Sequence, residues 1–248
     1  MTPARQLPLP FAHASHLTAA EFLAAPSNEE ALAWLRSPDW PQLRLALWGP
    51  EGSGKTHLLH VWAGQSGARL LAGPGLRFPQ ANWEPPQPLA IDDADAAPER
   101  DLLHLLNAAQ EAGAPALLAA RAPPSRWGVA LPDLASRLRS ITAAELRPPE
   151  DTLLRSLLAR LLAERQIAVP EAVQDWLRLR LPRTQGAMRE AAARLDRAAL
   201  AAGGRVTRAL AAQVLDGLSL TADHDHIAMD EDFAPGPALA PPAAARLL

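Results

Sequence analysis

A glycine-rich octapeptide constrains this 248-residue chain more than any other feature. It follows a short apolar segment, residues 43–48, that is typical of a buried strand, and it precedes a segment typical of a helix, residues 57–64. The octapeptide fits the pattern Gly-x4-Gly-Lys-Thr and consists of Gly49, Pro50, Glu51, Gly52, Ser53, Gly54, Lys55 and Thr56. Glycines let backbone N–H groups converge on phosphates, and a following helix adds its positive N-terminal end. A chance glycine-rich turn is the alternative, but the flanking segments favour a phosphate-binding loop.

The loop motif predicts specific roles for its last residues and for an acidic pair further along. Lys55 would reach the β- and γ-phosphates of ADP or ATP, and the Thr56 hydroxyl would ligate Mg²⁺. A second apolar segment, residues 88–91, ends in Asp92 and Asp93. Asp92 would hold Mg²⁺ through water, and Asp93 would orient or activate the attacking water. A solvated acidic pair at a strand end is the other interpretation.

Strand-like and helix-like segments alternate up to about residue 147, which predicts an α/β fold with a parallel sheet flanked by helices. The expected strands are residues 43–48, 88–91 and 116–120, and the expected helices are 57–64, 99–111 and one or two within 18–35. Beyond residue 148 only helical spacing is found, in residues 151–165, 170–179, 184–201 and 207–218. We therefore expect an N-terminal arm (1–15), a nucleotide-binding core (16–147), a small all-α domain (148–218) and a tail without a fold of its own (219–248).

Composition narrows the functional classes. With 24 basic and 27 acidic residues the formal net charge is −3, which argues against a protein that coats DNA. Cysteine is absent, so disulfides and thiolate metal sites are excluded. No charged-then-apolar leader and no apolar run of about 18 residues is found, which predicts a cytoplasmic protein without membrane contact.

Three motifs together resemble the DnaA-type branch of the AAA+ ATPases: residues 48–58, residues 89–93 and residues 131–138. Residues 161–170 are similar to the start of the lid domain of that branch, and the resemblance covers roughly residues 5–218. It implies an AAA+ P-loop NTPase fold with a small all-α lid. It also implies that His57 extends the nucleotide loop and that Asn28 packs near the adenine. For Asn28, a role as a plain helix cap is equally open.

Within that branch the chain is similar to the Hda group, the regulatory inactivators of DnaA, because no counterpart of the DNA-reading helix-turn-helix of DnaA is found. The resemblance implies a regulator of replication initiation that binds the sliding clamp and stimulates ATP hydrolysis by DnaA. The clamp-binding peptide would be Gln6, Leu7, Leu9, Pro10 and Phe11, with Pro8 between them. Its prolines pre-extend the backbone and its apolar side chains suit a groove. An ordinary proline-rich arm that packs on the chain's own core is the alternative.

Arg137 matches the arginine finger of DnaA-like proteins, which acts in trans on a neighbour's nucleotide and here would act on the ATP of DnaA. A structural arginine at the rim of the sheet is the alternative. Several departures from the family pattern predict weak intrinsic turnover. The strand 116–120 is followed by Arg121 instead of a polar sensor, and Asp93 replaces a longer glutamate. Gly186 stands at the lid-arginine position, for which Arg183 or Arg189 would have to substitute.

The expected partners are DnaA and the β subunit of the DNA polymerase III sliding clamp, with DNA contacted only indirectly and the chain associated with the replisome. Homo-oligomerisation is also compatible with a finger that needs a neighbour. Two rival functions stay open at this point: a noncatalytic adaptor that keeps ADP for structural reasons, and an AAA+ protein of the helicase-loader kind.

Overall fold

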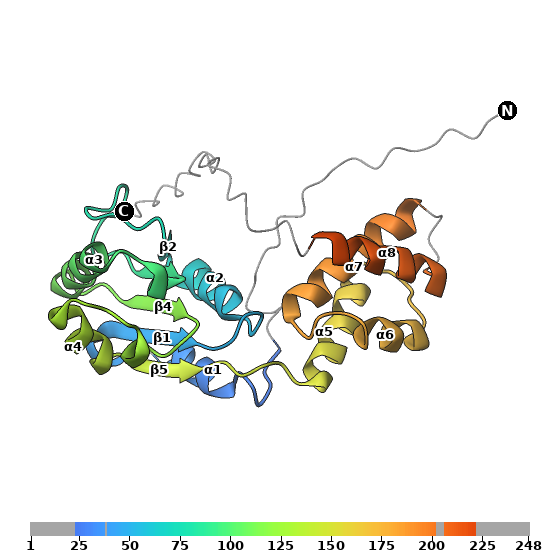
Figure 1. The fold of residues 1–248 in the computed structure, drawn as a ribbon, viewed down its shortest axis with the longest axis horizontal. Coiled ribbons are helices and arrows are strands. Elements are labelled where there is room, and N and C mark those ends of the chain that lie inside the picture. Colours follow the sequence, from blue (N-terminus) through green and yellow to red (C-terminus); the bar gives the residue numbers. More distant parts are fainter. Residues whose placement is uncertain (1–22, 38, 202–205, 222–248) are drawn as a thin grey trace, which may run out of the picture.

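The structure, a computed structural model, describes residues 23–37, 39–201 and 206–221. A sheet-based core and a helical lid lie side by side (Figure 1). The described part of the core contains one five-stranded sheet in which every pairing is parallel, in the order β2-β3-β4-β1-β5. The strands are β1 (Arg44–Trp48), β2 (Arg69–Ala72), β3 (Leu89–Asp92), β4 (Ala116–Ala120) and β5 (Thr142–Glu145).

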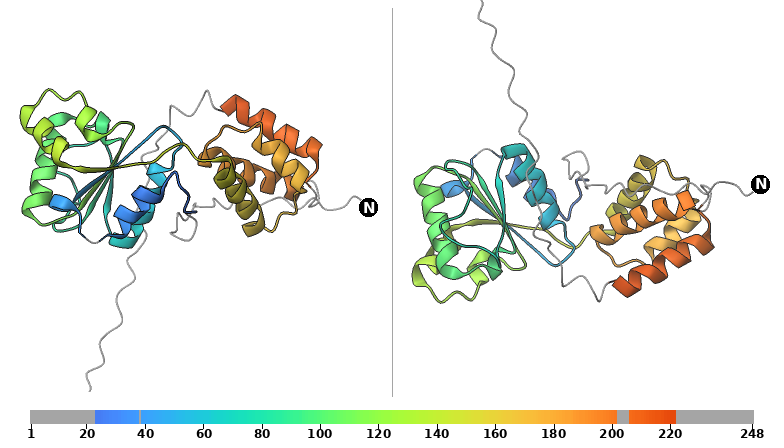
Figure 2. Two further views of the ribbon diagram at one scale, coloured as in Figure 1. Left: turned by 90° about the horizontal axis from the view of Figure 1, so that it is seen from below. Right: turned by 90° about the horizontal axis from the view of Figure 1, so that it is seen from above.

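Helices cover both faces of the sheet, and the apolar side chains of the strands alternate accordingly. In β1, Leu45 and Leu47 pack under α1 (Glu29–Arg36) and α2 (Lys55–Ser66), whereas Ala46 faces α3 (Glu99–Glu111) and α4 (Pro132–Ser140). Figure 2 shows these two pairs of helices on opposite sides of the sheet. The central strands β1 and β4 are buried nearly throughout because they are covered twice. The predicted α/β class and layered AAA+ architecture are confirmed.

The sequence-based prediction is incomplete at the edges of the sheet. It includes strands β1, β3 and β4, but it does not include strands β2 and β5 or helix α4. The two missed strands have four residues each and lie at the two edges. β2 alternates half-buried and exposed residues, and β5 has a single buried residue, Ala144. Short edge strands carry little apolar periodicity, so a pattern search passes over them. Three 3₁₀ turns complete the core: η2 (Pro41–Leu43), η3 (Ala94–Ala96) and η4 (Pro124–Arg126).

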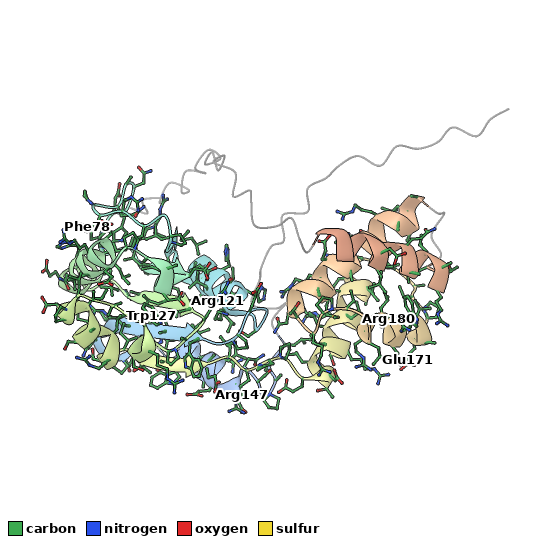
Figure 3. All side chains as sticks on the ribbon, in the orientation of Figure 1. Phe78, Arg121, Trp127, Arg147, Glu171 and Arg180 are labelled. Atoms are coloured by element: carbon green, nitrogen blue, oxygen red, sulfur yellow. The ribbon has the colours of Figure 1, made fainter. Side chains whose placement is uncertain are left out.

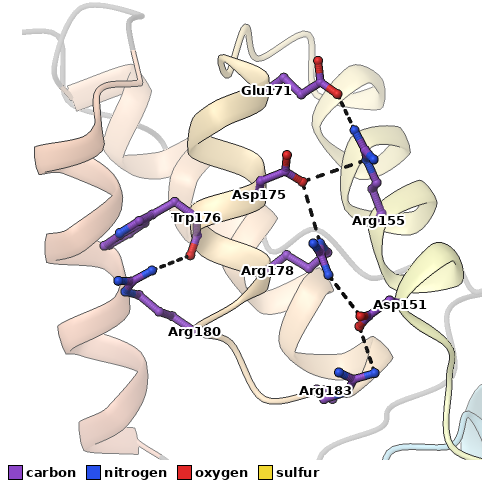
Figure 4. A network of polar contacts seen from close by, with 8 residues as sticks. All are labelled: Asp151, Arg155, Glu171, Asp175, Trp176, Arg178, Arg180 and Arg183. Carbon is purple, nitrogen blue, oxygen red and sulfur yellow. Dashed lines mark hydrogen bonds and ion pairs between the residues drawn. The ribbon is translucent and has the colours of Figure 1, made fainter.

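The described part of the lid contains four helices around a core made mostly of leucine and alanine. They are α5 (Asp151–Glu164), α6 (Glu171–Arg178), α7 (Gln185–Ala201) and α8 (Arg208–Thr221), and α8 ends three residues beyond the expected end of the lid. A network of ion pairs joins α5 to α6 on the lid surface (Figure 4). Asp175 lies 3.9 Å from Arg155 and 3.8 Å from Arg178. Most of these groups are half-exposed, and only the Arg178 side chain is largely buried, so the buried leucines contribute most of the lid's stability. Among the described helices, none is both long and apolar enough to cross a membrane.

Candidate nucleotide-binding site

The predicted phosphate loop joins the end of β1 to the start of α2, in the context that the motif requires. Gly49 lies so close to the segment after β5 that a Cβ atom there would be 2.1 Å from the carbonyl oxygen of Leu146. Gly54 has a φ of +101° and immediately precedes α2, which begins at Lys55. The loop is therefore confined to glycine at its first position by close backbone approach, and the N-terminus of α2 opens directly onto it.

The Lys55 side chain folds back over the loop. Its Nζ donates hydrogen bonds to the carbonyl oxygens of Gly49 and Pro50, each at 2.9 Å, and only 8% of the residue is exposed. Burial lowers the pKa of Lys55, while the negative charges of Asp92 and Asp93 act in the opposite direction. The ammonium group and the acidic pair thus share one electrostatic environment at the carboxyl end of the sheet.

Asp92 and Asp93 lie where β3 ends, two strands away from β1. An Oδ1 atom of Asp92 accepts the backbone N–H of Asp93 at 3.1 Å. Burial raises the pKa of Asp93, and the charges of Asp92 and Asp95 raise it further. Arg121 and Lys55 oppose this shift, which shows that both cations are close to the acidic pair. Lys55 and the acidic pair therefore converge, although they come from two separate strand ends.

Both the shape of the loop and its polar groups suit a polyphosphate bound with magnesium. The Ser53 hydroxyl is buried and has no hydrogen-bond partner among the described residues, although serine oxygen readily donates and accepts. Buried polar atoms are rarely left without a partner, so this oxygen marks a place for a ligand. Thr56, in the first turn of α2, is exposed, and Asp92 is half-buried. Thr56 and Asp92 would hold Mg²⁺, whose ordinary ligands are oxygens.

The start of the lid helix α7 packs directly on this loop. A Cβ atom at Gly52 would be 2.3 Å from Cγ2 of Thr184, and one at Gly54 would be 3.2 Å from Nε2 of Gln185. Gln185 is only 5% exposed. By contrast, a Cβ atom at Gly186 would meet nothing nearer than the Thr184 hydroxyl at 4.0 Å. Sequence reasoning selected Gly186 and missed Gln185, whose buried contact with the loop depends on how the two domains meet and leaves no local sequence signal.

The two arginines expected to substitute for a lid arginine differ in their surroundings. Arg183 is exposed and lies 2.8 Å from Asp151 of α5 (Figure 4). Arg189, about one turn after Gly186 in α7, acts electrostatically on His57. His57 is 4% exposed, and burial, Arg189 and His60 lower its pKa to about 3. His57 is therefore neutral at physiological pH. Of the two lid arginines, Arg189 is the one whose charge acts on a residue of α2, the helix that follows the loop.

Arg121 follows the last residue of β4, at the end of the core that faces the lid (Figure 3). Its backbone N–H donates to Oδ2 of Asp95 at 3.3 Å, and its guanidinium lies 4.0 Å from Oε2 of Glu51 in the loop. Both side chains of this ion pair are mostly exposed. An exposed cation near the loop thus takes the position where the DnaA-type motif that the sequence resembles has a neutral polar side chain.

Asn28 precedes α1, but its side chain does not form the hydrogen bond of a helix cap. Its Oδ1 accepts the N–H of Ala25 at 2.9 Å, and its Nδ2 donates to the carbonyl oxygen of Leu23 at 3.0 Å. Asn28 therefore takes the N-cap position that the capping interpretation gave it, but its amide closes the preceding turn instead of bonding to the helix. Asn28 is 1% exposed, and its packing near an adenine stays a prediction.

Arg137 lies in α4, away from the chain's own phosphate loop. Its Nη1 donates to Oε1 of Gln110 at 3.1 Å, and the same oxygen accepts from Arg44, the first residue of β1. The loop follows the other end of β1, so the length of the strand, roughly 16 Å at 3.3 Å per residue, separates the two places. In Figure 1 the strand arrows point toward the lid and α4 lies at the far side of the core. Arg137 is thus not brought together with the other predicted site residues.

The predicted clamp-binding peptide lies outside the described residues, and so does the tail from residue 222 onward. The roles assigned to these two segments therefore stay predictions from the sequence.

Comparison with known proteins supports the fold. A scan against protein-family models found no match. Domain III of the replication initiation protein DnaA from Thermotoga maritima superimposes with a TM-score of 0.67 at 20% identity, covering 81% of this chain and 96% of that domain. The A156S mutant of RuvB from Thermotoga maritima gives 0.62 at 18% identity, covering 81% of this chain and 72% of RuvB. A DNA replication initiation factor gives 0.54 at 16% identity, covering 70% of this chain and 62% of that protein.

These likenesses, together with the sheet order and the loop, show that the chain has the AAA+ P-loop NTPase fold.

Proposed function

We propose that this chain is an Hda-like regulator of replication initiation that binds ADP or ATP with Mg²⁺ and stimulates ATP hydrolysis on DnaA. The nucleotide part of the proposal is supported by the loop, by Lys55 close to Asp92 and Asp93, and by the buried Ser53 hydroxyl. The likeness to domain III of DnaA supports a DnaA-type partner, because AAA+ modules of similar shape can pack as neighbours.

One observation carries the regulatory part. Arg137 is held at the end of the sheet opposite to the chain's own loop, so it is available to another subunit's nucleotide and not to its own. An arginine supplied in trans stabilises negative charge on the transferring phosphoryl group and accelerates hydrolysis by about 10³–10⁵. The intrinsic turnover of the chain itself would be weak, since Arg121 replaces a neutral sensor and Gly186 replaces a lid arginine.

The experiment follows hydrolysis of ATP bound to DnaA, with and without this chain, in the presence of DNA-loaded sliding clamp. The wild-type chain is expected to accelerate hydrolysis and Arg137→Ala to lose most of that acceleration. Full stimulation by Arg137→Ala would overturn the finger.

The clamp tether is tested separately by pull-down with loaded clamp. Changing Gln6 and Leu9 to Ala should abolish binding, and unchanged binding would remove the peptide from the proposal.

A noncatalytic adaptor that retains ADP is the second candidate, and one observation favours it. Gln185 and Thr184 close the lid over the loop, which suits long nucleotide retention better than rapid exchange. This candidate predicts slow ADP release together with no effect of the chain on ATP bound to DnaA. The hydrolysis assay therefore separates the two functions.

A further inference from the structure

Gln110, near the end of α3, connects two arginines at the amino end of the sheet. Its Oε1 accepts one hydrogen bond from Nη2 of Arg44 at 2.8 Å and another from Nη1 of Arg137 at 3.1 Å. The Arg44 guanidinium also donates to the carbonyl oxygen of Leu106 at 2.8 Å. A single amide oxygen of α3 therefore links a residue of β1 to a residue of α4.

The two arginines differ in burial but share a lack of acidic partners. Arg44 is 2% exposed, and its Nη1 has no hydrogen-bond partner among the described residues. Within the described part of the chain, no carboxylate lies within 4.0 Å of either guanidinium, although Glu111 is the next residue after Gln110. Burial lowers the pKa of Arg44, and the charge of Arg137 lowers it further, so the two guanidinium groups repel each other across Gln110.

The choice of a neutral acceptor has a chemical consequence. A carboxylate in place of the amide would form charge-assisted, fork-like hydrogen bonds with a guanidinium and neutralise it. An amide oxygen fixes the direction of one N–H and leaves the positive charge uncompensated. Arg44 has the complementary effect. Its Nη2 holds the Gln110 oxygen in place through a hydrogen bond, and its positive charge repels that of Arg137.

We propose that Gln110, held by Arg44, is a positioning residue for Arg137 and presents its uncompensated guanidinium to a phosphate group on a partner subunit. This inference rests on the proposed function, since it deepens the role of the finger. Gln110 itself touches no phosphate. Its effect is on the orientation and the free charge of Arg137.

The experiment uses the full chain, ATP-loaded DnaA and DNA-loaded clamp, and measures both the maximal rate of hydrolysis and the concentration of chain that gives half of it. Gln110→Ala removes the orienting oxygen and is expected to lower the maximal rate about tenfold, since displacement of a catalytic group by about 1 Å can cost up to a hundredfold. The half-maximal concentration should not change. Gln110→Glu is expected to lower the rate further, because the new carboxylate pairs with Arg137.

Stability provides the readout that a purely structural role would not reproduce. Gln110→Glu keeps an acceptor for Arg44 and adds an ion pair, so its thermal midpoint should be unchanged or higher while its stimulation falls. Because stability and stimulation change in opposite directions in Gln110→Glu, this variant tests the proposal even if Gln110→Ala folds poorly. Gln65→Glu, which adds the same charge at an exposed position of α2, is the matched control and should retain the full rate.

Arg137→Ala in the same assay separates the two levels of the account. If Arg137→Ala loses stimulation while Gln110→Glu keeps it, the positioning role is wrong and the proposed function stands. If the Gln110 variants change the half-maximal concentration or the thermal midpoint but not the maximal rate, the residue is only structural and the inference is likewise overturned. If Arg137→Ala keeps full stimulation, or the wild-type chain gives none, the proposed function fails and the positioning role fails with it.

Discussion

At the carboxyl end of the sheet, Lys55 is buried, donates hydrogen bonds to two carbonyl oxygens and is influenced by the charges of Asp92 and Asp93. At the amino end, Arg137 is only partly buried and donates a hydrogen bond to the amide oxygen of Gln110, which also accepts one from Arg44. The first end is covered by the lid, through Thr184 and Gln185, whereas the second end is turned away from it. Both ends carry a cation suited to phosphate, but they carry it in opposite electrostatic settings.

Under the proposed function, this difference would let one sheet serve two nucleotides. A cation placed among carboxylates and covered by a lid suits a site that binds a polyphosphate together with Mg²⁺. A cation without acidic partners and open to one side gains most from a phosphate brought by another molecule. The predictions below test whether the two ends are as independent as this comparison requires, beginning with the largest expected effect.

The sharpest separation should come from comparing Lys55→Ala with Arg137→Ala in a thermal-shift assay. At a concentration of ADP·Mg²⁺ about one hundred times the dissociation constant, binding stabilises the folded wild-type chain by about 2.7 kcal/mol. Lys55→Ala should lose between about half and nearly all of this shift, because a charge-assisted contact to phosphate contributes about 1.5–3 kcal/mol. Arg137→Ala should keep it. Equal losses in both variants would break the comparison.

The acid sensitivity of the loop end is the next largest effect. The pKa of His57 is about 3 in the folded chain against an ordinary value of 6.5, so the unfolded chain takes up a proton that the folded chain does not. The stability that depends on neutral His57 is therefore complete above pH 6.5 and is lost as the pH falls toward 3. At 1.36 kcal/mol per pH unit, the loss is about 2 kcal/mol at pH 5.

The measurement is denaturant unfolding at pH 7 and pH 5. His57→Gln should flatten the decrease between the two pH values, whereas His104→Gln, at an exposed histidine of α3, should leave it as in the wild type. An identical decrease in all three proteins would show that His57 does not carry the effect.

Contact between lid and loop predicts a smaller change. Gly52→Ala places a Cβ atom against Thr184 at a residue whose φ is +73°, and a left-handed non-glycine residue costs about 1–2 kcal/mol. The matched control is Gly64→Ala in α2, where a Cβ atom meets nothing within 4 Å. The control should be as stable as the wild type or more stable by up to about 1 kcal/mol. If both variants unfolded at the same denaturant concentration, the packing of α7 on the loop would be refuted.

The smallest effect concerns the carboxyl of Asp93, whose ionised form is disfavoured by burial and by the charges of Asp92 and Asp95. Because the pKa of Asp93 is raised above its ordinary 3.8, ionising this carboxyl opposes folding once the pH exceeds the raised value. Asp93→Asn should therefore raise the thermal midpoint at neutral pH, and the gain should disappear below pH 3.8, where both folded and unfolded chains hold the proton. A gain that persists at low pH would point to a cause other than charge.

The two ends also differ in how far the sequence predicted them. The loop, Lys55 and the acidic pair were predictable because their roles depend on a fixed order of residues around one strand and one helix. Gln185 lies 131 positions from Gly54 of the loop, and Gln110 lies 66 positions from Arg44 and 27 from Arg137. No local pattern encodes such contacts, since they arise only when the helices pack on the sheet.

The two edge strands were not predicted from the sequence for a related reason. β5 consists of Thr142, two alanines and Glu145, and its conformation depends on pairing with β1 more than on its own composition. α4 does carry a local signal, because Pro132 and Asp133 occupy its first two positions and both residue types favour the start of a helix.

Titration calorimetry of the wild-type chain with ADP and with ATP in the presence of Mg²⁺ tests the central claim most directly. The account predicts one site per chain with a dissociation constant in the micromolar range, equivalent to about −8 kcal/mol. No heat of binding for either nucleotide at millimolar concentration would contradict it.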